Sequence, residues 1–162
     1  MNLKSLGLHP DFPTTVWIVI EQPRHEPIRY SYNPATESFT RTTYKSLSFD
    51  RGFSGAYGWI AGTGMPPEPH FDVIVVTQRD LQPGDLLEAS VCGMFRRRDN
   101  DHKFVAVDTA IAPNMKEPDL AALDLVTYSE LMRLYPDIGD QEGWFGGQAA
   151  RDFLKHNRPV HD

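Results

Sequence analysis

Seven short segments rich in β-branched and aromatic residues fill the first two thirds of the chain, and they limit the fold more than any other feature. Turn residues separate the segments, and most of the 13 prolines fall between them. Many short strands favour a small closed barrel, because closure removes the exposed edges that an open meander would leave. We therefore predict a mainly β, α+β fold with strands at 15–21, 28–33, 38–45, 57–61, 71–77, 86–98 and 103–107.

Helical periodicity appears only in the last third of the chain. Leucine and valine residues recur at helical spacing over 119–135, and Pro136 follows as a stop. A second, shorter helix is predicted at 148–156. With 162 residues, of which 40% are hydrophobic, the chain can bury one core but is too short for two ordinary domains. We expect a single domain over 1–162.

The charge balance argues against nucleic acid or an anionic membrane surface as a general partner. The net charge is −6, although Arg96 to Arg98 form a short basic run. The single Cys92 excludes an internal disulfide, and the N-terminal residues lack the apolar region of a signal peptide. No apolar run approaches the roughly 20 residues that a membrane span requires. These features predict a cytoplasmic protein without a membrane partner.

A loop with three prolines leads into an apolar segment in GTGMPPEPHFDVIVV, residues 62–76. It delivers an acid, Asp72, as the second residue of the predicted strand. Aspartate is a poor strand former and proline donates no backbone hydrogen bond, so local propensity does not explain the arrangement. Asp72 is either a turn residue at the start of the strand or a carboxylate placed for a site.

Polar residues elsewhere leave a similar choice. Arg29 alternates with the apolar residues of its strand, so it faces away from them. If residues 99–103 are extended, Asp99, Asp101 and Lys103 lie on the same face. The simplest interpretation is an exposed strand arginine and a hairpin tip, and the spacing does not fit an EF-hand.

The alternative is that the acids converge with Asp72 in one site. Three carboxylates brought together require compensating cations, and hard oxygen ligands favour Mg²⁺. Nearby arginine and lysine side chains would then suit a phosphate. Sequence spacing alone leaves both interpretations open.

The order of these motifs resembles the soluble Mg²⁺-dependent inorganic pyrophosphatases, from about residue 12 to about residue 154. The resemblance rests on VWIVIEQP, EPIRYS, AYGWI, FDVIVVT, LQPGD, GMFRRRDNDHKFVAV, LYPDI and EGW. It implies a five-stranded, OB-like closed barrel with flanking C-terminal helices and a polar site at one end. It also implies Mg²⁺ as the cofactor, pyrophosphate as the ligand and a homo-oligomer.

Residue roles follow from the same resemblance. The implied substrate-binding residues are Arg29, Lys45, Tyr57, Lys103 and Tyr135. The implied metal ligands are Asp72, Asp99 and Asp101, and Glu21 is implied as a supporting acid. Lys45 is assigned by counting back from Tyr57, so Arg41 remains an alternative.

The chain departs from the family pattern in the loop before Asp72. The family normally has Asp, any residue, Asp, Pro, any residue, Asp; here Pro67 and Pro69 stand at the first two acidic positions. By resemblance, one lost acid ligates metal and the other helps to deprotonate the attacking water. Glu68 and His70 are the replacements at hand, so the candidate catalytic residues are Asp72, Glu68 and His70. Three further departures are Ser31, Ala56 and Pro136.

Two functions follow from this pattern. The first is Mg²⁺-dependent hydrolysis of pyrophosphate, or of a related phosphoanhydride, with reduced or altered activity. The second is a catalytically inactive homologue that binds phosphate ligands or a protein partner. A third, nucleic-acid binding through the barrel, is disfavoured by the net charge.

Overall fold

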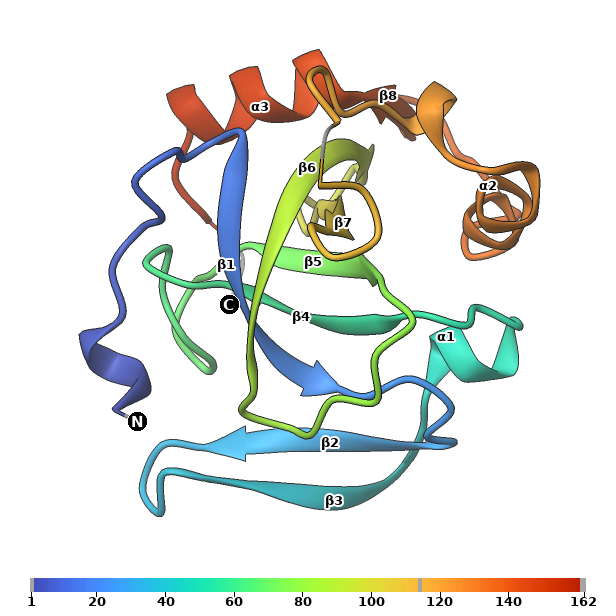
Figure 1. The fold of residues 1–162 in the computed structure, drawn as a ribbon. Coiled ribbons are helices and arrows are strands. Elements are labelled where there is room, and N and C mark those ends of the chain that lie inside the picture. Colours follow the sequence, from blue (N-terminus) through green and yellow to red (C-terminus); the bar gives the residue numbers. More distant parts are fainter. Residues whose placement is uncertain (1, 114, 161–162) are drawn as a thin grey trace.

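Five strands hydrogen-bond in a ring in the computed structural model, which describes residues 2–113 and 115–160 (Figure 1). They are β1 (Thr15–Gln22), β4 (Ala56–Ile60), β5 (Asp72–Val76), β6 (Leu86–Arg96) and β7 (Lys103–Asp108). Their order is β1-β4-β5-β7-β6, and β6 pairs back onto β1. Only β5 and β7 run parallel in this ring. The predicted closed five-stranded barrel is confirmed.

The remaining elements surround the barrel. A hairpin of β2 (Ile28–Asn33) and β3 (Ser38–Lys45) forms a separate sheet, and β8 (Gly143–Gly146) extends the barrel sheet at β6. The helices are α1 (Leu47–Asp50), α2 (Leu125–Met132) and α3 (Gly147–His156), and there are 3-10 turns at η1 (Leu3–Ser5) and η2 (Leu120–Ala122). Figure 1 shows α3 across one end of the barrel and the hairpin beside the opposite end.

Alternation along the strands separates the buried side chains into clusters. One face of the barrel strands contributes to the main core, which includes Val16, Ile18, Val73, Val75, Leu87 and Phe104, and Ala150 and Leu154 of α3 pack against it. The other face of β5, β6 and β7 contributes to a second cluster with Leu131 of α2. A third cluster joins Trp59 of β4 to Tyr32 of the hairpin. Burial on both faces explains why β7 is apolar at successive positions.

The predicted helix over 119–135 is confirmed only in part: the structure has the 3-10 turn η2 and the separate helix α2, with a break between them. Leu123 is extended, with ψ of 151°, and the Asp124 side chain caps a new helix by accepting a hydrogen bond from the Thr127 backbone N–H at 2.9 Å. Leu120 and Leu131 are buried, but Leu125 is 80% and Val126 is 71% exposed, so the apolar residues of this segment do not form one continuous buried stripe. The shorter C-terminal helix is confirmed to within one residue.

Two further differences concern strands and turns. β6 ends at Arg96, because residues 98–100 form the turn into β7 and Asn100 has a φ of 67°. The sequence analysis did not predict α1 or β8, which are both only four residues long.

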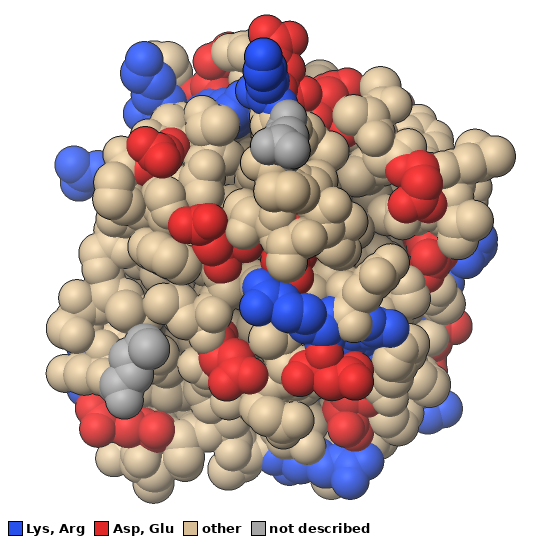
Figure 2. Space-filling model, viewed as in Figure 1, with Lys and Arg blue, Asp and Glu red and all other residues tan. Residues whose placement is uncertain are grey.

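Figure 2 shows acidic and basic groups alternating across the face that Figure 1 presents. Within the described residues, no helix has the length and apolar character needed to cross a membrane.

Candidate functional site

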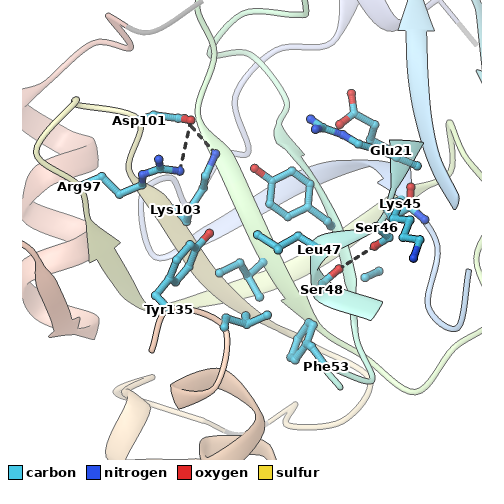
Figure 3. Close-up of a pocket in the computed structure, with 16 residues that line it drawn as sticks. Glu21, Lys45, Ser46, Leu47, Ser48, Phe53, Arg97, Asp101, Lys103 and Tyr135 are labelled. Carbon is cyan, nitrogen blue, oxygen red and sulfur yellow. Dashed lines mark hydrogen bonds and ion pairs between the residues drawn. The ribbon is translucent and has the colours of Figure 1, made fainter. Parts of the chain in front are cut away.

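A pocket of about 240 Å³ lies where the barrel strands meet the β2–β3 hairpin, α1 and the segment after α2 (Figure 3). It is lined by Glu21, Gln22, Arg29, Lys45, Ser46, Leu47, Ser48, Phe53, Ala56, Tyr57, Ile74, Arg97, Asp101, Lys103, Leu134 and Tyr135. Figure 3 shows Arg97, Asp101 and Lys103 on one side, across from Glu21 and Lys45. The pocket therefore collects polar groups from segments far apart in the sequence.

The parallel pairing of β5 and β7 determines one wall of this site. Asp72 lies opposite Lys103 in the register, and each is the first residue of its strand. The Lys103 ammonium donates hydrogen bonds to Asp72 Oδ2 at 2.8 Å and to Asp101 Oδ1 at 2.9 Å. Lys103 is only 7% exposed, so a buried cation lies between two carboxylates.

The proline-containing loop brings a second cation to Asp72. Gly64 has a φ of 133°, and a Cβ there would lie 1.9 Å from the Pro69 carbonyl oxygen, so glycine permits the close return of the loop. His70 donates from Nδ1 to the Glu68 carbonyl oxygen at 2.7 Å and from Nε2 to Asp72 Oδ1 at 2.9 Å. Both partners are acceptors, so His70 acts as a doubly protonated imidazolium.

The pKa directions agree with this network. Burial by itself would raise the pKa of Asp72, but the hydrogen bond from His70 and the charge of Lys103 lower it well below the ordinary value. Burial would lower the pKa of His70 and of Lys103, but Asp72 raises both. Asp72 is therefore ionised at neutral pH, and it favours the protonated forms of both Lys103 and His70.

Asp101 is compensated in a similar way. Its Oδ1 accepts from Lys103, and its Oδ2 lies 3.8 Å from Arg97 Nη1. Arg97 also donates from Nη2 to Asp99 Oδ2 at 3.1 Å. Arg97 was not predicted as a site residue, yet it lines the pocket. Its spacing of two residues from Asp99 would place it on the same face of an extended segment as Asp99, Asp101 and Lys103, and this spacing could have identified it.

Glu21 lies in the same pocket in a different electrostatic state. Burial, followed by the charge of Asp72, raises its pKa to about 7, although Arg29 acts in the opposite direction. Its carboxyl group is thus near the midpoint of its titration at neutral pH. It is not among the carboxylates in an ion pair within the described residues.

Two tyrosines complete the lining with neutral hydroxyl groups. The Lys103 ammonium lies 5.6 Å from the ring centroid of Tyr57, and Tyr135 stacks on Phe95 with centroids 4.3 Å apart. Burial is the main cause that raises the pKa of each phenol, so both hydroxyls keep their protons. These hydroxyls are available as hydrogen-bond donors to an anion.

The other predicted residues do not line the pocket. Asp72 contacts the lining residue Lys103, and His70 contacts Asp72. Asp99 lies in the turn between β6 and β7 with its side chain 52% exposed, and Glu68 is exposed and contributes its carbonyl oxygen to His70. Arg41, the alternative to Lys45, pairs with Glu26 at 3.1 Å, whereas Lys45 lines the pocket.

The donor set does not fit a carboxylate-bound Mg²⁺ ion. No three His, Cys, Asp or Glu side chains within residues 2–113 and 115–160 are grouped so that they could hold a metal. The two acids that remain near each other, Asp72 and Asp101, already face Lys103, His70 and Arg97. A dication would meet these positive charges at short range.

The barrel with its flanking helices has the OB-like fold of the pyrophosphatases. It is similar to the crystal structure of inorganic pyrophosphatase from Ehrlichia chaffeensis, with a TM-score of 0.70 and 17% identity over 93% of this chain and 97% of that one. It is also similar to the enzyme from Neisseria gonorrhoeae, with a TM-score of 0.70 and 20% identity over 94% of both chains. At these identities the likeness shows the fold alone.

The sequence comparisons define the family. Residues 18–138 match the family model described as "Inorganic pyrophosphatase". The inorganic pyrophosphatase of Pseudomonas aeruginosa is 27% identical over 165 residues, which cover 93% of each chain. The chain belongs to the inorganic pyrophosphatase family, so the predicted family is confirmed.

Proposed function

We propose that this family member binds pyrophosphate, or a related phosphorylated small molecule, in the pocket and hydrolyses its phosphoanhydride bond at a reduced rate. The observation that carries the proposal is the convergence of four cations on one pocket that also holds two neutral tyrosines. These cations are Arg29, Lys45, Arg97 and Lys103. Charge-assisted hydrogen bonds to phosphate oxygens are the strong contacts that such a group supplies.

The four cations of the pocket differ in whether their hydrogen-bond donors are already used by carboxylates. No ion pair within the described residues involves Arg29 or Lys45, so their donors are available to a ligand. Arg97 and Lys103 are already hydrogen-bonded to carboxylates, so they add mainly positive potential and their remaining donors. Tyr57 and Tyr135 would donate hydroxyl hydrogen bonds that orient the phosphate groups.

We expect a reduced rate because the residues of the loop before Asp72 lack a side chain in the pocket that could activate the attacking water. Pro67 and Pro69 offer neither a metal ligand nor a proton acceptor, and His70 has no free ring nitrogen to accept a proton while it donates to Asp72 and Glu68. Loss of an electrostatic or water-activating group typically costs about two to three orders of magnitude in rate. Mg²⁺ is the cofactor that the family implies, but no step is assigned to it because the donor set does not fit.

A non-catalytic role is the second candidate, and one observation favours it. Large apolar side chains are exposed near the pocket and on α2: Tyr44 is 71%, Leu47 is 51% and Leu125 is 80% exposed. Such residues suit a contact with a protein partner or with another copy of the chain. A homo-oligomer and a cytoplasmic location, which suits the free Cys92, belong to this proposal.

A phosphate-release assay combined with calorimetry tests the proposal. Pyrophosphate and a panel of nucleotides would be supplied with Mg²⁺, Mn²⁺ or Zn²⁺, and the P. aeruginosa relative would be assayed in parallel. We expect measurable pyrophosphate binding and phosphate release about 100-fold or more below that relative. Release equal to the relative would overturn the reduced rate, and absence of binding under every condition would overturn the function itself.

A further inference from the structure

We infer that the pocket binds pyrophosphate or another diphosphate as the metal-free anion, because Lys103, His70 and Arg97 already face the carboxylates that a metal ion would need. The inference rests on the proposed function, because it assumes that this pocket binds phosphate. It concerns the form of the ligand: the free polyanion rather than its Mg²⁺ complex.

The position of Lys103 is the first argument. Its ammonium lies 2.8 Å from Asp72 Oδ2 and 2.9 Å from Asp101 Oδ1, so one buried cation compensates both carboxylates. The side chain is 9% exposed, and the ring of Tyr57 lies 5.6 Å from its ammonium. Burial and paired contacts hold this charge in one place, unlike a surface lysine.

The second argument is that the other oxygens of the same carboxylates also face cations. His70 Nε2 lies 2.9 Å from Asp72 Oδ1, and Arg97 Nη1 lies 3.8 Å from Asp101 Oδ2. Mg²⁺ gives up its waters reluctantly and needs several anionic oxygens in near-ideal geometry. To bind here it would have to displace Lys103 and would remain close to two more positive charges.

The pocket lining also has more cations than acids. Two acids, Asp101 and Glu21, line the pocket together with four cations, and burial keeps the Glu21 carboxyl partly protonated near neutral pH. Lys103 and Arg97 are offset by carboxylates, but Arg29 and Lys45 have no ion pair within the described residues, so the pocket keeps positive potential without any added metal. Since Mg²⁺ neutralises part of the charge of pyrophosphate, its complex would be attracted less strongly than the free anion.

Calorimetry on the full chain tests the inference with pyrophosphate as the probe. One titration contains EDTA, and others contain increasing MgCl₂ at constant ionic strength. We expect binding in EDTA and an affinity that falls by about tenfold or more when Mg²⁺ saturates the pyrophosphate. Binding only with Mg²⁺ would overturn the inference and leave the proposed function standing. No binding in either condition would overturn the proposed function, and the inference with it.

Two variants test the role assigned to Lys103. Lys103→Met should weaken binding in EDTA by about tenfold or more, because it removes a buried cation that contacts the anion side of the pocket. The exposed Lys116→Met is the matched control and should bind as the parent does. Equal affinities for the two lysine variants would overturn the assignment.

Asp101→Asn keeps the inference testable if Lys103→Met does not fold. The substitution removes a negative charge but keeps an oxygen acceptor for Lys103. If the site is metal-free, this variant should bind pyrophosphate several-fold more tightly in EDTA. If the site needs a metal, the variant should lose pyrophosphate binding. Weaker binding of this variant in EDTA would therefore contradict the inference.

Discussion

The two sides of the pocket differ in how their charges are compensated. On the hairpin side, Arg29 and Lys45 are exposed and have no ion pair within the described residues. On the β5–β7 side, Asp72 and Asp101 are largely buried and meet cations on both carboxylate oxygens. The hairpin side therefore has positive charge available to a ligand, whereas the charges on the β5–β7 side are neutralised by ion pairs within the protein.

This difference separates stability from binding. Charges that are buried and paired contribute to folding and cannot be removed singly without leaving a partner uncompensated. Exposed charges without partners contribute little to folding and are free to hold a ligand. Substitutions on the two sides should therefore affect different measurements.

The largest effect is expected for Asp72→Asn. The substitution leaves the buried Lys103 and His70 cations with one carboxylate fewer, and breaking a buried charge pair costs about 3–5 kcal/mol. Urea denaturation would measure the loss of unfolding free energy. The half-exposed Asp99→Asn is the control and should change it by less than about 1 kcal/mol. Similar losses for both variants would contradict the proposed difference between buried and exposed acids.

The next effect concerns the acids that the loop lacks. The combined variant Pro67→Asp, Pro69→Asp and Ser31→Glu introduces the acids that the resemblance to the family implies at these positions. It should raise Mg²⁺-dependent pyrophosphate hydrolysis by about 100-fold, because groups for metal binding and water activation return while the anion ligands are unchanged. Phosphate release would measure the gain, with Ser31→Glu alone as the control. A folded combined variant with no gain would argue against the account of reduced activity.

The sequence predicted the fold well because the barrel depends on local patterns. Alternation and turn residues predicted β2 and β3 at their observed bounds, and the order of motifs named seven of the 16 residues that line the pocket. The predicted 119–135 helix is interrupted because Asp124 caps a separate helix, which apolar spacing does not reveal. The pairing of Lys103 with Asp72 could not be read from spacing alone, since it depends on the register of strands 31 residues apart in the chain, whereas Asp101 was predicted on the same face as Lys103.

A smaller effect is expected on the hairpin side. Arg29→Ala and Lys45→Ala should each weaken pyrophosphate binding by about tenfold, the scale of one charge-assisted contact. The unfolding free energy should stay within about 0.5 kcal/mol of the parent, because both side chains are exposed. Calorimetry and urea denaturation would be run on the same samples. Arg41→Ala, in the same hairpin but outside the pocket lining, should leave binding unchanged, and a loss equal to that of Arg29→Ala would show that the effect is not specific to the pocket.

The smallest effect tests Glu21, which lies between the two sides. The pKa of Glu21 is about 7 in the folded protein, compared with an ordinary value of 4.5, which we take for the unfolded chain. Between pH 4.5 and pH 7 the folded protein therefore holds a proton that the unfolded chain has released. Stability therefore falls as the pH rises from 4.5 to 7, and the full penalty is present above 7. Glu21→Gln removes this ionisation and should stabilise the protein at pH 8 by on the order of 1 kcal/mol, since solvent in the pocket screens part of the shift.

Thermal unfolding at pH 5 and pH 8 would measure this difference. Near pH 5 the folded Glu21 is protonated, so glutamine and glutamic acid are close in charge and in hydrogen-bonding capacity, and the stabilisation should nearly vanish. The control is Glu37→Gln, at a side chain that is 62% exposed, for which the difference from the parent should be alike at both pH values. A stabilisation by Glu21→Gln that is the same at pH 5 and pH 8 would show that packing, not the buried charge, causes it. If the gain appears only at pH 8, Glu21 is the pocket acid whose charge the fold opposes, whereas Asp72 is the acid whose charge the fold requires.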